Sequence, residues 1–379
     1  MEGRAHPDVG TVVAGKYELC ELAGEGGMAT VWKGKMLGAA GFSRPVAIKK
    51  MKAQFGTLRE YIDMFVEEAR VGAAIQHPNI VQVIDFLQDD FGSYYLVLEW
   101  IDGIDLHHLV TTFRKANHPL PWGLVAAVGI GGLRGLSVAH ERVDEAGSPA
   151  PIIHRDVSPQ NLLLSSRGEV KLADFGLALA KDRIAMATMQ GMVKGKLSYL
   201  SPEGVSGQQA SPRSDIFAMG TVLWEALSGR RLFEGSDDVE VFKKVKRAHV
   251  PPLGEVRRGL PEGLIQAIHK ALAVDPANRF VSARQFAMVL SELLGGARNA
   301  EKAQGLLSQA VGEVKRWRSE EAALRAAGPA AGSSSASQAS TSWEDVDVEF
   351  SEIAALPRVE NSRESLDFWF SKIENKLPE

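Results

Sequence analysis

Two short apolar runs, each bordered by a polar loop with an acidic residue, are the feature that most constrains the fold. The first lies in "PIIHRDVSPQNLLL", where Asp156 and Asn161 stand five residues apart. The second lies in "EVKLADFGLA", which contains Asp174. Loops that border short strands are where proteins usually present functional side chains. We therefore expect these two loops to carry functional residues.

The sequence before these runs has the alternation of a β-rich lobe. The segments "YELCEL", "TVWKGKM", "RPVAIKKM", "NIVQVIDFLQ" and "YYLVLEWI" alternate or run apolar as strands do. One segment, "LREYIDMFVEEARVGAAI", instead places Ile62, Phe65 and Ala69 on one helical face. Residues 16–98 are thus predicted to form a small β-rich lobe with one helix.

The sequence beyond residue 102 is mostly helical in pattern. Helical periodicity is found around residues 124–140, 216–227, 239–248, 263–273 and 283–294. This predicts a larger α-helical lobe over residues 102–294. The expected fold class is α+β, with two lobes and the two apolar runs between them.

Composition narrows the class of protein. The chain has 379 residues, 45% hydrophobic residues and a formal net charge of -4, so nothing indicates nucleic acid or anionic lipid as a partner. Cys20 is the only cysteine, which excludes an intramolecular disulfide and fits a reducing compartment. The N-terminus lacks an apolar signal region, and "WGLVAAVGIGGL" is short and glycine-rich for a membrane span. We expect a soluble, cytoplasmic protein.

The sequence after the helical lobe divides into three segments. Residues 298–327 have helical periodicity, and residues 328–342, "GPAAGSSSASQASTS", have the composition of a flexible linker. Residues 343–379 carry ten acidic and four basic residues, with aromatic residues at Trp343, Phe350, Phe368, Trp369 and Phe370. The run "SLDFWFSKIENKL" predicts a helix with one apolar face. It is either a docking helix for a partner or a terminal helix packed on its own lobe.

The glycine-rich stretch "GEGGMATV" has two readings. Gly24, Gly26 and Ala29 have the spacing of a phosphate-binding loop, which alone is weak evidence. In a dinucleotide-binding fold such a loop joins a strand to a helix. Here both flanks alternate as strands, which favours a hairpin whose backbone approaches phosphate groups. An ordinary glycine turn is the alternative.

Further motifs follow in a fixed order. Lys49 in "VAIK" lies on the next predicted strand, and "FVEEA" supplies Glu67 and Glu68 on the helix after it. "HRD" with Asn161, "DFG", "SPE", "SDIFAMG" and "DPANRF" complete the series. Over roughly residues 16–294 the chain resembles the eukaryotic-like (Hanks-type) serine/threonine kinases of bacteria. This resemblance selects Glu68 over Glu67, because Glu68 lies nine residues before His77, as in those kinases.

This resemblance implies ATP as a cofactor, with Mg²⁺, which Mn²⁺ can replace. It implies that Asp156 accepts the proton of the attacking hydroxyl, that Lys49 held by Glu68 contacts the phosphates, and that Asn161 and Asp174 ligate the metal. The residues expected to bind ATP are Ala23, Gly24, Glu25, Gly26, Gly27, Val31, Ala47, Lys49, Leu98, Glu99, Ile101 and Leu163. For the single apolar residues, ordinary β-core is the alternative.

The resemblance also implies structural and regulatory roles. Asp215 is expected to anchor the catalytic loop, the loop that contains Asp156 and Asn161. Arg279 is expected to pair with Glu203. Arg155, which precedes Asp156, implies control by phosphorylation of the activation segment, which lies between Asp174 and Glu203. Among its hydroxyl residues Thr188 is our choice, with Ser198, Tyr199 and Ser201 as the other candidates.

Four positions depart from the family pattern. Ala23 and Ala29 replace larger aliphatic and glycine residues of the glycine loop. Ser158 stands where the family has a lysine that contacts the γ-phosphate. The absence of that lysine removes on the order of 2–4 kcal/mol of transition-state stabilisation. Lys196 stands where relatives have a threonine next to that lysine. We hypothesise that Lys196 supplies the missing charge.

Three functions can be compared with these motifs, and they account for them to different extents. An active protein kinase that acts on serine or threonine of other proteins and on itself accounts for every motif. A pseudokinase or nucleotide-binding scaffold that acts through its tail is the alternative, but Lys49, Glu68, Asp156, Asn161 and Asp174 are all present. A small-molecule phosphotransferase does not explain the activation segment and "SPE".

Overall fold

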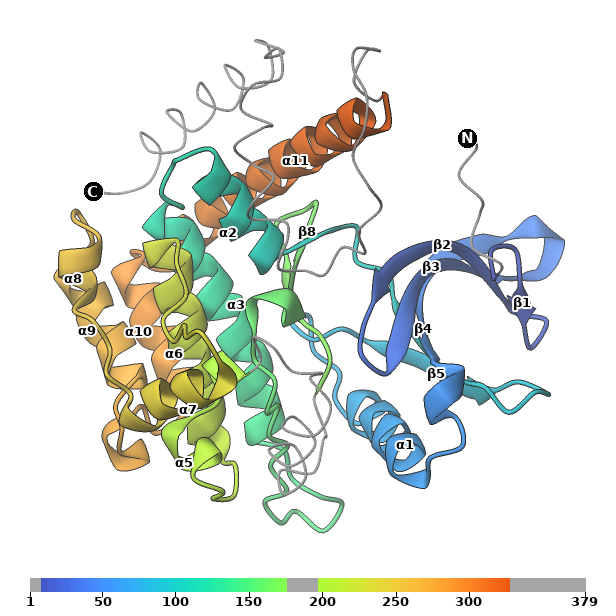
Figure 1. Cartoon of the computed structure of the whole chain (residues 1–379), viewed down its shortest axis with the longest axis horizontal. Coiled ribbons are helices and arrows are strands. Elements are labelled where there is room, and N and C mark those ends of the chain that lie inside the picture. Colours follow the sequence, from blue (N-terminus) through green and yellow to red (C-terminus); the bar gives the residue numbers. More distant parts are fainter. Residues whose placement is uncertain (1–7, 176–196, 328–379) are drawn as a thin grey trace.

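The computed structural model describes residues 8–175 and 197–327 and divides into two lobes (Figure 1). The smaller lobe contains a six-stranded antiparallel sheet of order β1-β2-β3-β4-β6-β5 and one long helix, α1. The larger lobe is mostly helical. The predicted α+β fold class and the bilobal architecture are confirmed.

The sheet of the smaller lobe is built from the strands that alternation predicted. Its elements are β1 (Val12–Val13), β2 (Tyr17–Glu25), β3 (Ala29–Leu37), β4 (Ser43–Met51), α1 (Arg59–Ala73), β5 (Val83–Gln88) and β6 (Tyr94–Glu99). One sheet face packs a core around the fully buried Trp32 and Ile48, and Phe65 of α1 packs a second core. On the opposite face of the sheet, Ala29 of β3 and Met51 of β4 are buried in this second core, whereas Val31, Ala47 and Lys49 are only half-buried.

The glycine stretch is the turn of the β2–β3 hairpin. β2 and β3 pair antiparallel from Tyr17 opposite Met36 to Glu25 opposite Thr30. No helix follows the glycines, so the dinucleotide-binding alternative is wrong and the hairpin prediction is confirmed.

A small three-stranded sheet connects the lobes. It consists of β7 (Gly103–Asp105), β8 (Leu162–Ser165) and β9 (Val170–Leu172), in the order β7-β8-β9. The two apolar runs that border the acidic loops are β8 and β9, with the short 3-10 turn Pro159–Asn161 just before β8. Leu162 and Leu164 are buried, which fixes the loops on either side of the hairpin.

The helices of the larger lobe surround α3 and α6. They are α2 (Leu106–Lys115), α3 (Trp122–His140), α5 (Pro202–Val205), α6 (Pro212–Ser228), α7 (Asp238–Arg247), α8 (Leu253–Val256), α9 (Glu262–Ala271), α10 (Ala283–Leu293) and α11 (Ala297–Ala327). Short 3-10 turns lie at Ala39–Gly41, Ala53–Phe55, Leu197–Tyr199 and Pro276–Asn278.

The helix α3 is longer than its apolar run suggested. Among the described residues it is the one helix long and apolar enough to cross a membrane. However, 78% of its apolar window is buried inside the larger lobe, which is typical of a core helix.

Candidate active site

The loop before β8 presents Asp156 and Asn161 beside each other. The side-chain amide of Asn161 donates to the backbone oxygen of Asp156 at 2.7 Å and to its carboxylate at 3.2 Å. Because the amide nitrogen is used in this way, the side-chain oxygen of Asn161 lies on the opposite side of its amide group. That oxygen is the atom that could ligate a cation.

Asp215, at the start of α6, holds the catalytic loop in place through hydrogen bonds to its backbone. Its buried carboxylate accepts hydrogen bonds from the backbone N–H groups of His154 and Arg155, both at 2.8 Å, and lies 2.7 Å from His140 Nε2. Burial alone would raise the pKa of Asp215, but these donors hold it below its ordinary value. Arg155 has a φ of 65°, and its own N–H is one of the two groups held by Asp215. The predicted anchoring role of Asp215 is confirmed.

His154 joins the catalytic loop to the segment after β9. Its Nε2 lies 3.0 Å from the backbone oxygen of Ala173, and its Nδ1 accepts from the N–H of Asp156 at 3.2 Å. Burial lowers the pKa of His154, so the imidazole is neutral, with Nε2 as donor and Nδ1 as acceptor. The two acidic loops are thereby held in a fixed relation.

Asp174 extends from the end of this segment toward the smaller lobe. It has a φ of 54°, and its side chain is 40% exposed. Its carboxylate accepts a hydrogen bond from Lys49 Nζ at 3.1 Å, which connects β4 of one lobe to the loop after β9 of the other. The carboxylate of Asp174 thus lies next to Lys49 and links the two lobes.

Lys49 also pairs with Glu68 of α1. Lys49 Nζ donates to Glu68 Oε1 at 2.6 Å, and both side chains are largely buried. Burial alone would lower the pKa of Lys49, but Asp174 and Glu68 outweigh it and hold the ammonium charged. Burial raises the pKa of Glu68 to about 7, against the lowering effect of Lys49. Glu67, the alternative considered above, is exposed and lies 3.7 Å from Arg70 instead.

Several predicted nucleotide-binding residues share one face of the sheet with Lys49. Val31 lies opposite Lys49, and Ala47 lies opposite Leu98, so period-two alternation places them on the same side. Val31, Ala47 and Leu98 are half-buried, whereas their strand neighbours Trp32, Val46, Ile48 and Val97 are fully buried. Leu163 of β8 is likewise half-buried between Leu162 and Leu164. Leu98 also packs against the second core of the smaller lobe, so the β-core alternative remains open for it.

The segment after β6 connects the lobes. Glu99 turns its carboxylate toward the larger lobe, where Lys171 of β9 donates to it at 2.6 Å, and it also accepts from the N–H of Gln82 at 2.8 Å. Ile101 follows and is half-buried. We refer to residues 99–102 as the hinge. The sequence did not reveal Lys171, because a contact across 72 residues leaves no local pattern.

The tip of the glycine hairpin is exposed. Ala23, Gly24, Glu25, Gly26 and Gly27 are all exposed, and the N–H of Gly26 donates to the backbone oxygen of Ala29 at 2.8 Å. A side-chain β-carbon placed on Gly24 would meet nothing within 4 Å. The fold itself therefore does not require glycine at this position.

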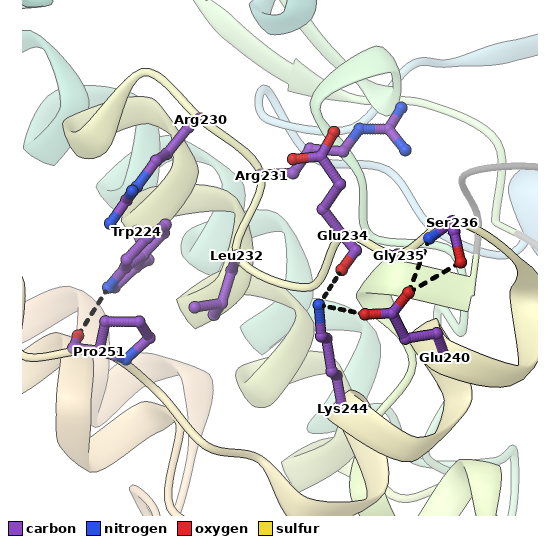
Figure 2. A pocket seen from close by; sticks show the side chains of 10 residues that line it. All are labelled: Trp224, Arg230, Arg231, Leu232, Glu234, Gly235, Ser236, Glu240, Lys244 and Pro251. Carbon is purple, nitrogen blue, oxygen red and sulfur yellow. Dashed lines mark hydrogen bonds and ion pairs between the residues drawn. The ribbon is translucent and has the colours of Figure 1, made fainter.

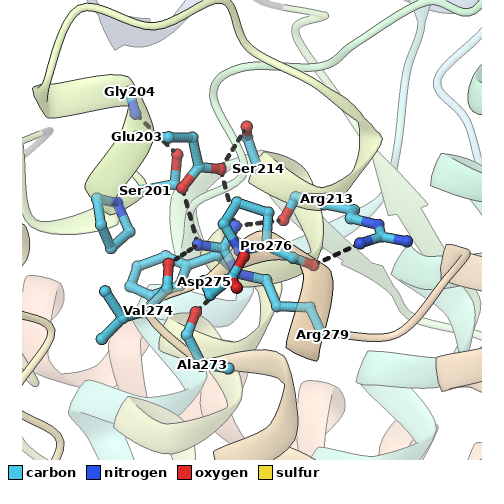
Figure 3. Close-up of polar contacts among 12 residues, drawn as sticks. Ser201, Glu203, Gly204, Arg213, Ser214, Ala273, Val274, Asp275, Pro276 and Arg279 are labelled. Carbon is cyan, nitrogen blue, oxygen red and sulfur yellow. Dashed lines mark hydrogen bonds and ion pairs between the residues drawn. The ribbon is translucent and has the colours of Figure 1, made fainter.

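A buried ion pair lies beside the start of α6 (Figure 3). Arg279 donates to both carboxylate oxygens of Glu203 at 2.8 Å, and Ser214 donates to the same carboxylate. Arg279 also donates to the backbone oxygens of Ala273, Val274 and Arg213. The predicted pairing of Glu203 with Arg279 is confirmed.

The family follows from comparison with known proteins. The model described as "Protein kinase domain" matches residues 17–289, well over half of the chain. The chain belongs to the protein kinase family. Family membership implies the use of ATP and a divalent metal ion.

Similar kinases are bacterial. "Tyrosine-protein kinase MasK" of Myxococcus xanthus is 39% identical over 282 residues, which cover 74% of this chain and 43% of the relative. "Serine/threonine-protein kinase PknA" of Mycobacterium tuberculosis is 34% identical over 304 residues, covering 79% of this chain and 66% of the relative. The chain thus spans less than two thirds of each. The crystal structure of the PknI kinase domain of Mycobacterium tuberculosis has a TM-score of 0.56 at 28% identity, covering 76% of this chain and 99% of that one.

A pocket of about 600 Å³ lies elsewhere on the kinase, in the larger lobe (Figure 2). Lys244 in its wall donates to the backbone oxygen of Glu234 at 2.7 Å and pairs with Glu240 at 2.8 Å. The lining residues include Trp224, Arg230, Arg231, Leu232 and Pro251. None of the predicted catalytic residues within the described ranges, namely Lys49, Glu68 and Asp156, lines this pocket, so it is separate from their site.

Two predicted residues of the kinase lie outside the described residues, namely Lys196 and Thr188. Ser158, the proposed counterpart of Lys196, is buried directly before the 3-10 turn that carries Asn161. The predicted linker and acidic tail, residues 328–379, also lie outside the described ranges.

Proposed function

We propose that this chain is an ATP-dependent protein kinase that transfers the γ-phosphate of ATP to serine and threonine hydroxyls of proteins, itself included. The observation that carries this proposal is the contact of Lys49 with both Glu68 and Asp174, at 2.6 and 3.1 Å. A catalytically competent kinase needs the lysine–glutamate pair and the metal-binding aspartate in place together. A scaffold that only binds partners has no need of a buried cation held between two carboxylates.

The proposed chemistry is an in-line displacement. The substrate hydroxyl oxygen attacks the γ-phosphorus, the bond to the ADP oxygen breaks, and Asp156 takes the hydroxyl proton. Asn161 and Asp174 would hold Mg²⁺, which neutralises phosphate charge when bound. Their donor oxygens suit a hard cation. Lys49 would position the α and β phosphates as a point charge fixed by Glu68.

The proposed nucleotide site lies between the lobes. Val31, Ala47 and Leu163 would enclose the adenine, with Leu98 at the back of the site and the backbone of Glu99 and Ile101 at its edge. The exposed backbone from Ala23 to Gly27 would cover the phosphates. The glycine at position 24, which the fold does not require, supports close approach of the backbone to a ligand.

The proposal also gives a role to Lys196. We infer that Lys196 provides the positive charge that other kinases place at the position of Ser158. Ser158 supports this, because its small, buried and uncharged side chain supplies no cation at that position. A cation near the γ-phosphate would stabilise the charge that develops during transfer.

The proposed site of control is Thr188, with Arg155 as the partner of its phosphate. The other hydroxyls of the segment are engaged in the fold. Ser198 donates to the backbone oxygen of Phe233 at 2.8 Å, Tyr199 donates to Glu225 at 2.7 Å, and Ser201 is buried as the N-cap of α5. Their engagement favours Thr188.

The proposed organisation is a kinase domain over residues 16–294, a helical extension over 298–327, a linker over 328–342 and an acidic tail over 343–379. The aromatic residues and negative charge of the tail suit a docking segment for a protein partner. We propose a cytoplasmic location, which the single cysteine and the burial of α3 support.

Phosphoamino-acid analysis tests the proposal and the choice of hydroxyl. The full chain is incubated with radiolabelled ATP and Mg²⁺, alone and with a generic basic protein, and the products are hydrolysed. Label on phosphoserine and phosphothreonine is expected. Label only on phosphotyrosine would instead agree with the printed name of the relative MasK. Absence of label would favour the pseudokinase alternative.

A further inference from the structure

The long helix α11 lies outside the residues that the family model matches, yet it packs on the larger lobe. The family match ends at residue 289, and α11 begins at Ala297. One face of α11 is buried in the lobe's main core, and the helix contacts α2, α3, β7 and β8 (Figure 1). Its buried residues are Ala303, Leu306, Leu307, Ala310, Val311 and Val314. The helix is therefore an integral part of this lobe.

The helix approaches the turn between β8 and β9 very closely. Ser308 donates to the backbone oxygen of Ser166 at 2.7 Å. Gly168 in the same turn has a φ of 75°, and a β-carbon there would lie 2.1 Å from the backbone oxygen of Gln304. Only glycine permits this contact, so the position of α11 and the position of the turn depend on each other.

The same turn holds the last hinge residue, Asp102. The backbone N–H of Ser166 donates to the Asp102 backbone oxygen at 2.7 Å, and the Ser166 hydroxyl lies 2.9 Å from the Asp102 carboxylate. Lys315 of α11 donates to the other carboxylate oxygen at 2.5 Å. Asp102 is thus held by its backbone from the turn and by its side chain from α11.

The β8–β9 hairpin contacts both ends of the hinge, Glu99 and Asp102. Ser166 at its turn binds Asp102, and Lys171 on β9 binds Glu99. Ile101, which the proposed function places against adenine, lies between these two attachments. A change in the hairpin turn is therefore expected to move the backbone that faces the nucleotide.

We propose that α11 is a positioning element for nucleotide binding, and that Lys315 and the turn at Gly168 transmit its position to the hinge through Asp102. The inference rests on the proposed function, because it assumes that adenine contacts the hinge. An exposed ion pair contributes little, so removing Lys315 is expected to weaken ATP binding only about two- to threefold. Displacing the turn disturbs several hydrogen bonds together, so about a tenfold loss is expected.

Matched variants of the full chain test this. Gly168→Ala is compared with Gly147→Ala, because Gly147 has a similar φ of 78° but open space around its position. Lys315→Ala is compared with Lys315→Arg, which retains the charge, and with Lys302→Ala, an exposed lysine of the same helix. The readouts are the Kd of a non-hydrolysable ATP analogue with Mg²⁺, KM for ATP, kcat and the melting temperature.

Gly168→Ala and Lys315→Ala are expected to raise the Kd and KM for ATP while kcat at saturating ATP stays within about twofold of wild type. Gly147→Ala, Lys302→Ala and Lys315→Arg are expected to retain wild-type affinity. If Gly168→Ala and Gly147→Ala lower the melting temperature alike and neither changes the Kd, α11 has only a stabilising role and the inference is overturned. A wild-type chain that binds no ATP contradicts the proposed function itself, and the inference with it.

Discussion

Glu68 Oε1 lies 2.6 Å from Lys49 Nζ, and this pair joins α1 to the central strand β4. The same ammonium reaches Asp174 across the interlobe opening. Because Lys49 on β4 contacts residues of two other segments, α1 and the loop after β9, its position depends on how these three segments are arranged. This arrangement supports the proposal that the chain binds nucleotide and metal together.

Replacing Glu68 by Gln is expected to lower kcat/KM for ATP about tenfold or more, which corresponds to at least ~1.4 kcal/mol. The amide carries no charge and holds Lys49 less firmly. Steady-state phosphotransfer assays measure the change. Glu67→Gln is the matched control, since Glu67 is adjacent on α1 but exposed. Equal losses in both variants would argue that the helix, and not the ion pair, is responsible.

The proposed role of Lys196 gives a second prediction. Lys196→Ala is expected to lower kcat about 10²- to 10³-fold, because it removes a cation that stabilises transition-state charge. Adding Ser158→Lys to this variant is expected to restore part of the rate. Lys194→Ala, two residues away, is the control and is expected to remain active. Undiminished activity of Lys196→Ala would reject the compensation.

The buried ion pair beside the start of α6 predicts an order of stabilities. Arg279→Ala is expected to cost about 3–5 kcal/mol of unfolding free energy, since it leaves the Glu203 carboxylate buried without its partner. Glu203→Gln is expected to cost less, because Arg279 still donates to three backbone oxygens. Urea denaturation measures both. The reverse order would show that the carboxylate, and not the arginine, organises this cluster.

Glu225 gives a prediction for pH. Burial raises its pKa to about 7, while Tyr199 and the N–H of Leu232 donate to it. Between pH 4.5 and 7 the folded chain binds the proton that the unfolded chain has lost, so the stabilisation from this group is complete below pH 4.5 and decreases as pH rises through 7.

In Glu225→Gln this titration is absent, and the amide can still accept from Leu232 and donate to Tyr199. The difference in unfolding free energy between the variant and wild type is therefore expected to shift in favour of the variant from pH 5 to pH 8, by on the order of 2 kcal/mol. Denaturant melts at both pH values measure it. A difference that does not change with pH would contradict the raised pKa.

Local patterns predicted the parts of the site that adjoin each other in sequence. Alternation located the hairpin of β2 and β3, and the apolar runs around Asp156 and Asp174 became β8 and β9. These features depend on short-range periodicity, which the sequence displays directly. The choice of Glu68 over Glu67 rested instead on the spacing from His77 in the bacterial kinases that the chain resembles, and the structure places Glu68 beside Lys49.

Contacts between distant charged residues could not be predicted in this way. Lys171 meets Glu99 across 72 residues, and Lys315 meets Asp102 across 213. A single lysine on a strand or helix surface is most often a solvated charge, so neither residue stood out. Only the folded arrangement of β9 and α11 around the hinge identifies them.

The most direct test of the account compares wild type with Asp156→Asn. Both proteins are incubated with radiolabelled ATP and Mg²⁺, and incorporation into a basic protein and into the chain itself is measured, with binding of a non-hydrolysable ATP analogue as the control for folding. The account predicts that Asp156→Asn binds the analogue as wild type does but loses nearly all phosphotransfer. Equal incorporation by both proteins would contradict the assignment of this chain as an active kinase that uses Asp156.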